Sequence, residues 1–360
     1  MYTDHINNIH VEVTDRCNAE CPVCPRSYSG GETFPYVRDK ELDLAYFKLI
    51  GQEFLSKIKT WNFCGVKGDP ASAQELFEIL DYILYCNPDT RILIRTNGGA
   101  RNEKFWIRVG ELFFNKDCDV VWSVDGWEET NHIYRKNVKW NKLYNNIMAY
   151  INTGASSMWE FNMFGHNQVD LPKVTEFCNT HNISLTTRKP FGFEEAGGFT
   201  KTIAVYNKTG DGKTSEYAYS IKPHGVAESQ IADVVYPSTV DKHEWTPGVY
   251  DMMRSSWLKT SGTTVQCQST KEGTRSQEIY LDSNGMIFPC CYTAGKFHMG
   301  DFQINTMFRP YKRKLVVTEE NSIYDVLNLD LFTKVMPDGM SGKLDDDAGY
   351  CITCATHCKF

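Results

Sequence analysis

The sequence predicts an α/β fold with a parallel sheet, because of how its segments alternate. Short apolar segments of strand type alternate with segments of helical periodicity through the first half of the 360-residue chain. Such alternation is typical of parallel strands joined by right-handed helical crossovers. The strand segments number six, too few for a complete eight-stranded barrel, so a partial barrel or a doubly wound sheet remains. In either architecture, functional residues are expected at the carboxyl ends of the strands.

Each predicted strand is short, with alternating apolar residues or a run rich in β-branched and aromatic residues. In chain order, the strands are residues 9–14 (IHVEVT), 60–65 (TWNFCG), 91–96 (RILIRT), 119–126 (DVVWSVDG), 158–165 (MWEFNMFG) and 183–187 (ISLTT).

The predicted helices lie between these strands, at residues 39–57, 72–85, 103–114, 141–151 and 170–181. The second helix has Leu76, Ile79 and Ile83 at helical spacing. Ser72 and Glu75 are expected to form a capping box at its start, because each side chain can satisfy a free amide of the first turn. Asp170, followed by Leu171-Pro172, predicts the start of the last helix.

The pattern changes after residue 195, which divides the chain into three predicted parts. Residues 1–195 form the barrel domain, and residues 196–265, rich in Gly, Thr and Tyr, form a linker or insertion with room for a hairpin. Residues 266–360 are expected to form a small cysteine-rich α+β domain. Within it, Asn284-Gly285 predicts the turn of a hairpin.

Composition excludes several classes of protein. The net charge of −7 gives no electrostatic case for binding nucleic acid. The N-terminus lacks the features of a signal peptide, and no apolar run is long enough to span a membrane, so a cytoplasmic protein is expected. Thirteen cysteines in a reducing compartment are not expected to form a disulfide framework. Some are therefore predicted to be metal ligands.

Three cysteines follow the first strand directly, in the stretch TDRCNAECPVCPR: Cys17, Cys21 and Cys24. Three thiolates can hold three corners of a [4Fe–4S] cluster and leave the fourth iron open. An open metal position is typical of a catalytic site. The alternatives are a structural zinc site, which would need a fourth ligand, and cysteines without a common role.

The spacing C-x3-C-x2-C after a first strand, with a β/α repeat behind it, resembles the radical S-adenosylmethionine (SAM) superfamily over about residues 7–195. The resemblance implies a partial (β/α)6 TIM-like barrel in which the amino and carboxylate groups of SAM chelate the open iron. An electron from the cluster then cleaves SAM to methionine and a 5′-deoxyadenosyl radical, which abstracts a hydrogen atom from the substrate. Val23 stands where the family usually has an aromatic residue.

The resemblance also implies SAM-binding residues in the turns after the second and fourth strands. Lys67, Gly68 and Asp69 match the Gly-Gly-Glu segment that meets the SAM ammonium group. Ser123 and Asp125 match positions that bind the SAM ribose and its surroundings. The alternative for both segments is an ordinary turn at the end of a strand.

Arg135 matches the arginine that meets the SAM carboxylate, a partner that suits the guanidinium fork. A solvated surface arginine is the alternative. His166 and Asn167 follow the fifth strand, where a contact with SAM or substrate is expected. A role in capping the loop is equally compatible with the sequence.

The C-terminal cysteines resemble the SPASM/twitch extensions of radical SAM enzymes, which hold auxiliary iron–sulfur clusters. Six thiols cannot fill two four-thiolate sites, so one auxiliary [4Fe–4S] cluster is expected, or a zinc site on the same ligands. The predicted ligands are Cys267, Cys290, Cys351 and Cys354. If Cys290 and Cys291 lie in a strand, only one of them faces the cluster. Cys291 and Cys358 are then ligands, structural residues or a hydrogen donor.

The sequence therefore predicts a radical SAM enzyme that abstracts hydrogen from a C–H bond of a small molecule or peptide. Cys17 lies 16 residues from the first residue, so no peptide-recognition domain is expected before the barrel, which favours a small molecule or a short peptide. An electron donor such as flavodoxin or ferredoxin is an expected partner, whereas nucleic acid and membrane are not. The alternative is a non-catalytic iron–sulfur or zinc protein that senses redox state.

Overall fold

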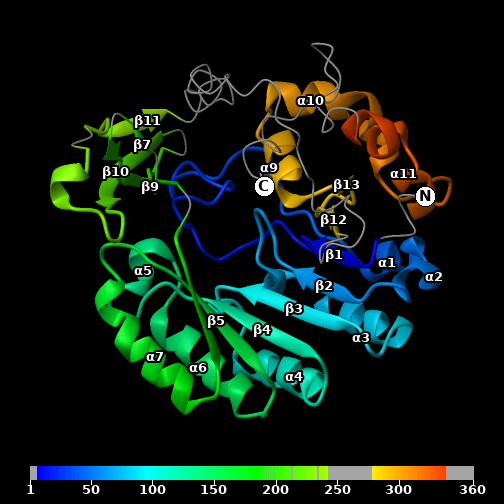
Figure 1. Ribbon diagram of the computed structural model, residues 1–360, viewed down its shortest axis with the longest axis horizontal. Helices are drawn as coiled ribbons and strands as arrows, with labels where there is room; N and C mark the ends of the chain where they lie inside the picture. Colours follow the sequence, from blue (N-terminus) through cyan, green and yellow to red (C-terminus); the bar gives the residue numbers. More distant parts are fainter. Residues whose placement is uncertain are drawn as a thin grey trace.

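A curved eight-stranded sheet forms the centre of the computed structural model (Figure 1). The structure describes residues 6–241, apart from residues 191, 194, 197, 212, 213, 233 and 234, and residues 278–337. Its strands are β1 (Asn8–Val11), β2 (Thr60–Phe63), β3 (Arg91–Thr96), β4 (Cys118–Ser123), β5 (Ser157–Asn162), β6 (Ser184–Arg188), β12 (Glu278–Leu281) and β13 (Ile287–Phe288). The spatial order is β13-β12-β1-β2-β3-β4-β5-β6.

Strands β1 to β6 are parallel and lie in chain order, which confirms the six predicted strands and the partial barrel. Four helices cover the outer face of the sheet: α3 (Leu76–Cys86), α4 (Glu103–Phe113), α6 (Trp140–Ile151) and α7 (Leu171–Thr180). Trp106 of α4 packs on Trp122 of β4 with ring centroids 4.8 Å apart, and both are fully buried. Truncating such a side chain to alanine typically costs about 3–5 kcal/mol, so this contact stabilises the packing of α4 on the sheet.

The first predicted helix, residues 39–57, is wrong as a single element. The structure has α1 (Leu44–Ile50), which begins after Asp43, whose carboxylate accepts from the amide of Tyr46 at 2.8 Å. Gly51 then separates α1 from α2 (Gln52–Leu55) with a φ of +93°, a conformation that glycine adopts without strain. A short helix α5 (Asn131–Tyr134) also lies between β4 and α6.

Two predicted helix caps are also wrong. Ser72 ends a short 3₁₀ helix, and the carboxylate of Glu75 accepts from the amide of Leu44 instead of closing a capping box. Helix α7 begins at Leu171 as predicted, but the carboxylate of Asp170 binds Thr130 and the amide of Trp127 rather than its own helix. The 3₁₀ helices are η2 (Pro70–Ser72), η3 (Gln168–Asp170), η4 (Glu228–Gln230) and η5 (Arg309–Leu315).

The hairpin expected within residues 196–265 exists and belongs to a larger unit. Strands β9 (Ile203–Lys208), β10 (Thr214–Ile221) and β11 (Thr239–Asp241) form an antiparallel sheet, and β7 (Glu195–Ala196) pairs with β8 (Phe199–Thr200). The amide of Tyr206 donates to the carbonyl of Ser29 at 3.0 Å. This small sheet is therefore attached to the loop that follows the three N-terminal cysteines.

The hairpin predicted around Asn284-Gly285 is formed by β12 and β13. Strand β12 pairs with β1 in parallel, with Asn8 opposite Glu278, so this part of the chain extends the barrel sheet. Gly285 has a φ of +78° and lies against the ring of Tyr46. Helices α9 (Cys291–His298), α10 (Phe302–Phe308) and α11 (Ile323–Leu327) and the π-helix η6 (Leu331–Val335) follow.

Within the part of the chain that the structure describes, no helix combines the length and the apolar character needed to cross a membrane.

Candidate cofactor-binding site

A cavity of about 300 Å³ lies at the carboxyl ends of the parallel strands. The loop after β1 contributes Cys17, Cys21 and Cys24, and the loop after β2 contributes residues 64–69. Among the predicted site residues, Lys67, Gly68, Asp69, Ser123 and Arg135 also line it. The structure therefore brings most of the predicted site together.

The three thiols are largely buried, and each has a different hydrogen-bond environment. Burial raises the pKa of Cys17 and Cys21 above the ordinary value, and it raises the pKa of Cys24 to about 12. The Arg135 guanidinium opposes this rise at Cys21, and its Nη1 donates to the Cys21 sulfur at 3.7 Å. The Cys17 sulfur accepts from the amide of Ala19 at 3.3 Å and from Asn97 Nδ2 at 3.5 Å.

These thiols fit the ligand set of an iron–sulfur cluster. Among the described residues, no three Cys, His, Asp or Glu side chains converge as ligands of a single metal ion would. Thiolates of a [4Fe–4S] cluster bind separate irons, so they surround the cluster without converging on one point. The N–H donors beside Cys17 and Cys21 suit sulfur ligands that carry negative charge, because hydrogen bonds to the charged form favour it.

The cysteine loop is tied to the loop after β2. Arg26 is nearly buried, and its Nη1 donates to the carbonyls of Asp15 at 3.1 Å and Lys67 at 2.7 Å. The Cys24 sulfur lies 3.7 Å from the carbonyl of Val66. Arg26 therefore joins the two loops through their backbone carbonyls.

Glycine is required at position 68 for packing. A Cβ atom at Gly68 would lie 1.7 Å from the carbonyl oxygen of Thr14, so any side chain would force the two loops apart. The close backbone partner of Gly68 is therefore Thr14 in the loop that carries the cysteines.

Asp69 binds neighbouring groups of the protein. Its carboxylate accepts from Asn97 N and Nδ2, both at 2.8 Å, from the Thr96 hydroxyl at 2.9 Å, and from Ala71 N at 3.0 Å. These donors occupy the four lone pairs of the carboxylate in this arrangement, and the contact of Asp69 with the SAM ammonium group stays a prediction. Asp69 fixes Asn97, which reaches Cys17. Burial raises the pKa of Asp69, against the effect of these hydrogen bonds.

Asp125 and Arg135 form a buried ion pair, with Nε 2.6 Å from Oδ2. Asp125 is fully buried and is not among the residues that line the cavity, so its role near the SAM ribose stays a prediction. It also accepts from Asn162 N at 2.7 Å and Nδ2 at 3.0 Å. Burial alone would lower the pKa of Arg135, but Asp125 and Cys21 raise it above its ordinary value. Arg135 is thus held charged at the wall of the cavity, which Ser123 also lines.

Asn167 forms the hydrogen bonds of a loop-capping residue, the alternative that the sequence allowed, and its contact with SAM or substrate stays a prediction. It is fully buried, and Nδ2 donates to the carbonyls of Asp125 at 2.9 Å and Asn162 at 2.8 Å. Its Oδ1 accepts from the amide of Phe164 at 2.8 Å. His166 lines a separate cavity of about 640 Å³ beside the small antiparallel sheet.

Sequence reasoning missed several polar residues inside the barrel. Arg95 lines the cavity and donates through Nε to Asn62 Oδ1 at 3.0 Å, and its Nη1 lies 2.5 Å from Glu160 Oε1. Arg188 binds the same oxygen of Glu160 at 2.6 Å. The strand alternation holds a signal for these residues, because Arg95 and Glu160 occupy positions opposite to the buried apolar set of β3 and β5.

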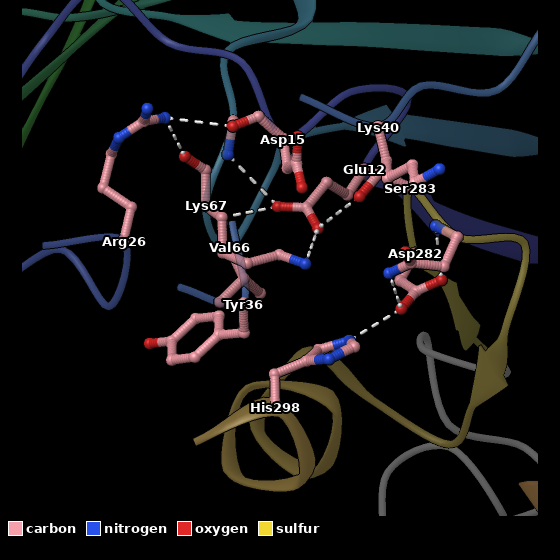
Figure 2. Close-up of polar contacts among 12 residues, drawn as sticks. Glu12, Asp15, Arg26, Tyr36, Lys40, Val66, Lys67, Asp282, Ser283 and His298 are labelled. Carbon is pink, nitrogen blue, oxygen red and sulfur yellow. Dashed lines mark hydrogen bonds and ion pairs between the residues drawn. The ribbon is translucent and has the colours of Figure 1, made fainter. Parts of the chain in front are cut away.

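Glu12 is another residue that the sequence did not single out. It is fully buried at the end of β1, and its Oε2 lies 3.2 Å from Lys67 Nζ (Figure 2). The carboxylate also accepts from the amides of Lys67 at 2.5 Å and Gly68 at 3.1 Å. Lys67, predicted to meet SAM, thus directs its ammonium group to Glu12.

The predicted auxiliary ligands are only partly within the described residues. Cys290 precedes helix α9, and Cys291 is the first residue of that helix, so the prediction that they are neighbours in a strand is wrong. Cys267, Cys351, Cys354 and Cys358 lie outside the described residues. The nine cysteines that the structure describes form no disulfide. The auxiliary cluster stays a prediction.

The fold is similar to those of several solved structures. Streptococcus suis SuiB bound to precursor peptide SuiA matches with a TM-score of 0.52 and 10% identity, over 92% of this chain and 66% of SuiB. anSMEcpe with bound AdoMet matches with a TM-score of 0.49 and 13% identity, over 91% of this chain and 78% of that chain. The chain spans 61% of SuiB in its structure with bound S-adenosylmethionine.

No protein-family model matches the sequence, and no curated protein matches it. The structural neighbours are radical SAM enzymes, and this chain has their fold, with a partial parallel barrel and mixed α/β layers.

Proposed function

We propose that the chain is a radical SAM enzyme that binds a [4Fe–4S] cluster through Cys17, Cys21 and Cys24. The observation that carries the proposal is a single cavity, at the carboxyl ends of the strands of a radical SAM fold, that contains all three thiols and the side chains of Ser123 and Arg135. In its parallel-barrel architecture, this end is where active sites lie.

When bound, the cluster supplies the electron that cleaves SAM to methionine and a 5′-deoxyadenosyl radical. The protein's own residues bind and orient SAM. Arg135, held by Asp125, presents a charged guanidinium that suits the SAM carboxylate. Because the Asp69 carboxylate is filled, backbone carbonyls of residues 65–69 are the acceptors we assign to the SAM ammonium group.

The substrate is proposed to be a peptide or a small molecule that gives up a hydrogen atom from a C–H bond. The structure of SuiB with its precursor peptide supports a peptide. Arg95 and Asn162 line the cavity and offer polar contacts for a charged or amide-rich substrate. The outcome after hydrogen abstraction can be epimerisation, oxidation or cross-linking.

The remaining parts of the proposal concern the partners. Cys290 is proposed as a ligand of an auxiliary [4Fe–4S] cluster, together with Cys267, Cys351 and Cys354. An electron donor such as flavodoxin or ferredoxin would reduce the clusters. A reducing, cytoplasmic compartment fits a site built from free thiols, because thiolate ligands must stay unoxidised.

The test is anaerobic production of 5′-deoxyadenosine by the reconstituted protein with dithionite and SAM, measured by chromatography and mass spectrometry. The wild type should form it only with reductant present. The Cys17→Ala/Cys21→Ala/Cys24→Ala variant should form none. Equal production of 5′-deoxyadenosine by wild type and variant would exclude the assignment. If the wild type with its cluster formed none, with or without reductant, a non-catalytic redox protein would be favoured.

A further inference from the structure

Three consecutive backbone amides of the loop after β2 are held by side chains from two other strands. The amides of Lys67 and Gly68 donate to the same carboxylate oxygen of Glu12, at 2.5 and 3.1 Å. The amide of Val66 lies 3.4 Å from the hydroxyl of Tyr280, in β12. These hydrogen bonds from Glu12, directly after β1, and from Tyr280 of β12 therefore help to set the conformation of the loop, together with the contact from Arg26.

The burial of Glu12 costs free energy, because its charge is removed from water. Its side chain is fully buried, and that of Lys67 is 2% exposed, so neither charge has access to bulk water. Replacing such a buried pair by apolar residues is often neutral or stabilising, which makes the pair weak evidence for stability alone. A second role for Glu12 would explain why a carboxylate occupies this site.

The part of the chain after residue 277 also contacts Glu12. The Ser283 hydroxyl lies 3.5 Å from Glu12 Oε2, and the amide of Glu12 donates to the carbonyl of Leu281 at 2.8 Å. The neighbouring Asp282 carboxylate binds His298 Nε2 at 2.7 Å. Figure 2 shows Glu12 between Lys67 and Ser283, with His298 of α9 reaching Asp282 from below.

We propose that Glu12 is a positioning residue for SAM. Its carboxylate fixes the amides of Lys67 and Gly68, so that the backbone of residues 65–69 is preorganised at the cavity beside the cysteine loop. Tyr280 completes this device by holding Val66. The inference rests on the proposed function, because it takes SAM to be the ligand of this cavity.

Preorganisation requires the hydrogen-bond acceptor and not the charge. Glu12→Gln/Lys67→Met removes both charges and keeps an oxygen that can accept from both amides. Glu12→Leu/Lys67→Met removes both charges and the acceptor. The two variants are similar in volume and carry no unpaired buried charge, so a comparison between them isolates the hydrogen bonds to the loop.

The first measurement is hydrogen–deuterium exchange of the amides of residues 66–68 in the full chain without SAM. The amides of Lys67 and Gly68 should remain protected in the Gln/Met variant and exchange at least ten-fold faster in the Leu/Met variant. The second is SAM affinity of the reconstituted protein by calorimetry. The Leu/Met variant should bind SAM at least ten-fold more weakly than the Gln/Met variant, a difference of about 1.4 kcal/mol.

A matched control is Glu53→Gln/Lys57→Met, which removes an exposed ion pair of 2.9 Å near α2 and should change neither measurement. Tyr280→Phe tests the same loop without altering a charge. If the Leu/Met variant gives no cooperative melting transition, Tyr280→Phe tests instead whether the hydrogen bonds to the loop support SAM binding. It should deprotect Val66 and weaken SAM binding.

Equal SAM affinity in the Gln/Met and Leu/Met variants, or faster exchange with no change in SAM affinity, would overturn the positioning role. If the wild type binds no SAM, the proposed function and with it the role toward SAM fail, whereas the exchange data still report whether Glu12 holds the loop. The two failures are therefore distinguishable.

Discussion

Asp125→Asn is the substitution with the clearest expected effect on stability. Asp125 is fully buried, and its partner Arg135 is 16% exposed, with 2.6 Å between Nε and Oδ2. Asparagine keeps an oxygen that can accept from Asn162 but removes the charge. The Arg135 guanidinium then stays buried without its counter-charge.

Breaking a buried ion pair by removing one partner costs about 3–5 kcal/mol. The unfolding entropy is about 2.1 cal/mol/K per residue, which gives about 0.76 kcal/mol/K for a chain of 360 residues. The loss therefore corresponds to a decrease in Tm of about 4–7 °C. Asp125→Asn/Arg135→Met should recover most of it, because no unpaired charge remains.

The assay is thermal unfolding of the anaerobic protein without cluster, followed by tryptophan fluorescence. The control is Asp117→Asn, which breaks an exposed pair with Arg91 of 3.2 Å. An exposed pair contributes about 0.2–1 kcal/mol, so Tm should change by no more than about 1.3 °C. A decrease for Asp125→Asn as small as that of the control would refute the account of this pair.

Three further predictions test other parts of the structure. Burial raises the pKa of Glu278 to about 7, above its usual 4.5, so the folded chain loses stability as the pH rises between these values. Glu278→Gln should therefore raise Tm at pH 8 and leave it unchanged near pH 4.5. The same shift in Tm at both pH values would disprove this. Gly68→Ala should lower Tm by about 1–4 °C, because overpacking costs about 1–3 kcal/mol. The control Gly210→Ala should leave Tm unchanged, since Gly210 has open space around it. Equal Tm values for the two variants would count against the close packing of Gly68 on Thr14. Cys290→Ala should lose about one cluster's worth of iron and Cys291→Ala none, and the reverse result in an iron assay would exchange their roles.

The sequence predicts the barrel well because its strands are short and carry a regular set of apolar residues, which β3 and β5 bury at alternate positions. Strand β12 could not be placed in the same way, since its pairing with β1 joins Asn8 to Glu278 across most of the chain. No local pattern specifies which strand a distant hairpin will join. The break in the first helix at Gly51 is the opposite case, because a glycine near a predicted helix end is a visible signal.

The site is predictable in position but not in the direction of each side chain. The cysteines in the loop after β1 and Ser123 at the end of β4 line the cavity as predicted, and so does Arg135, which follows α5. Asp125 and Asn167 follow strands too, yet their polar atoms bind neighbouring protein groups. A sequence shows that a carboxylate lies at a strand end, but the donors that fill its lone pairs come from distant segments.

Glu12 shows the same limit of sequence reasoning, although the strand alternation does indicate the direction of its side chain. It lies between Val11 and Val13 in the first strand segment, so alternation directs it to the face opposite these valines. A carboxylate on the inner face of a barrel needs a partner. Lys67 is that partner, but only the fold brings it within 3.2 Å.

The most direct test of the central claim is electron paramagnetic resonance of the reduced, reconstituted protein with and without SAM. If Cys17, Cys21 and Cys24 hold a cluster with an open iron, the wild-type spectrum should change when SAM is added. Cys17→Ala/Cys21→Ala/Cys24→Ala should lose the SAM-sensitive signal, while Cys290→Ala should keep it. A wild-type spectrum unaffected by SAM, or a SAM-sensitive signal that persists in the triple variant, would contradict the account.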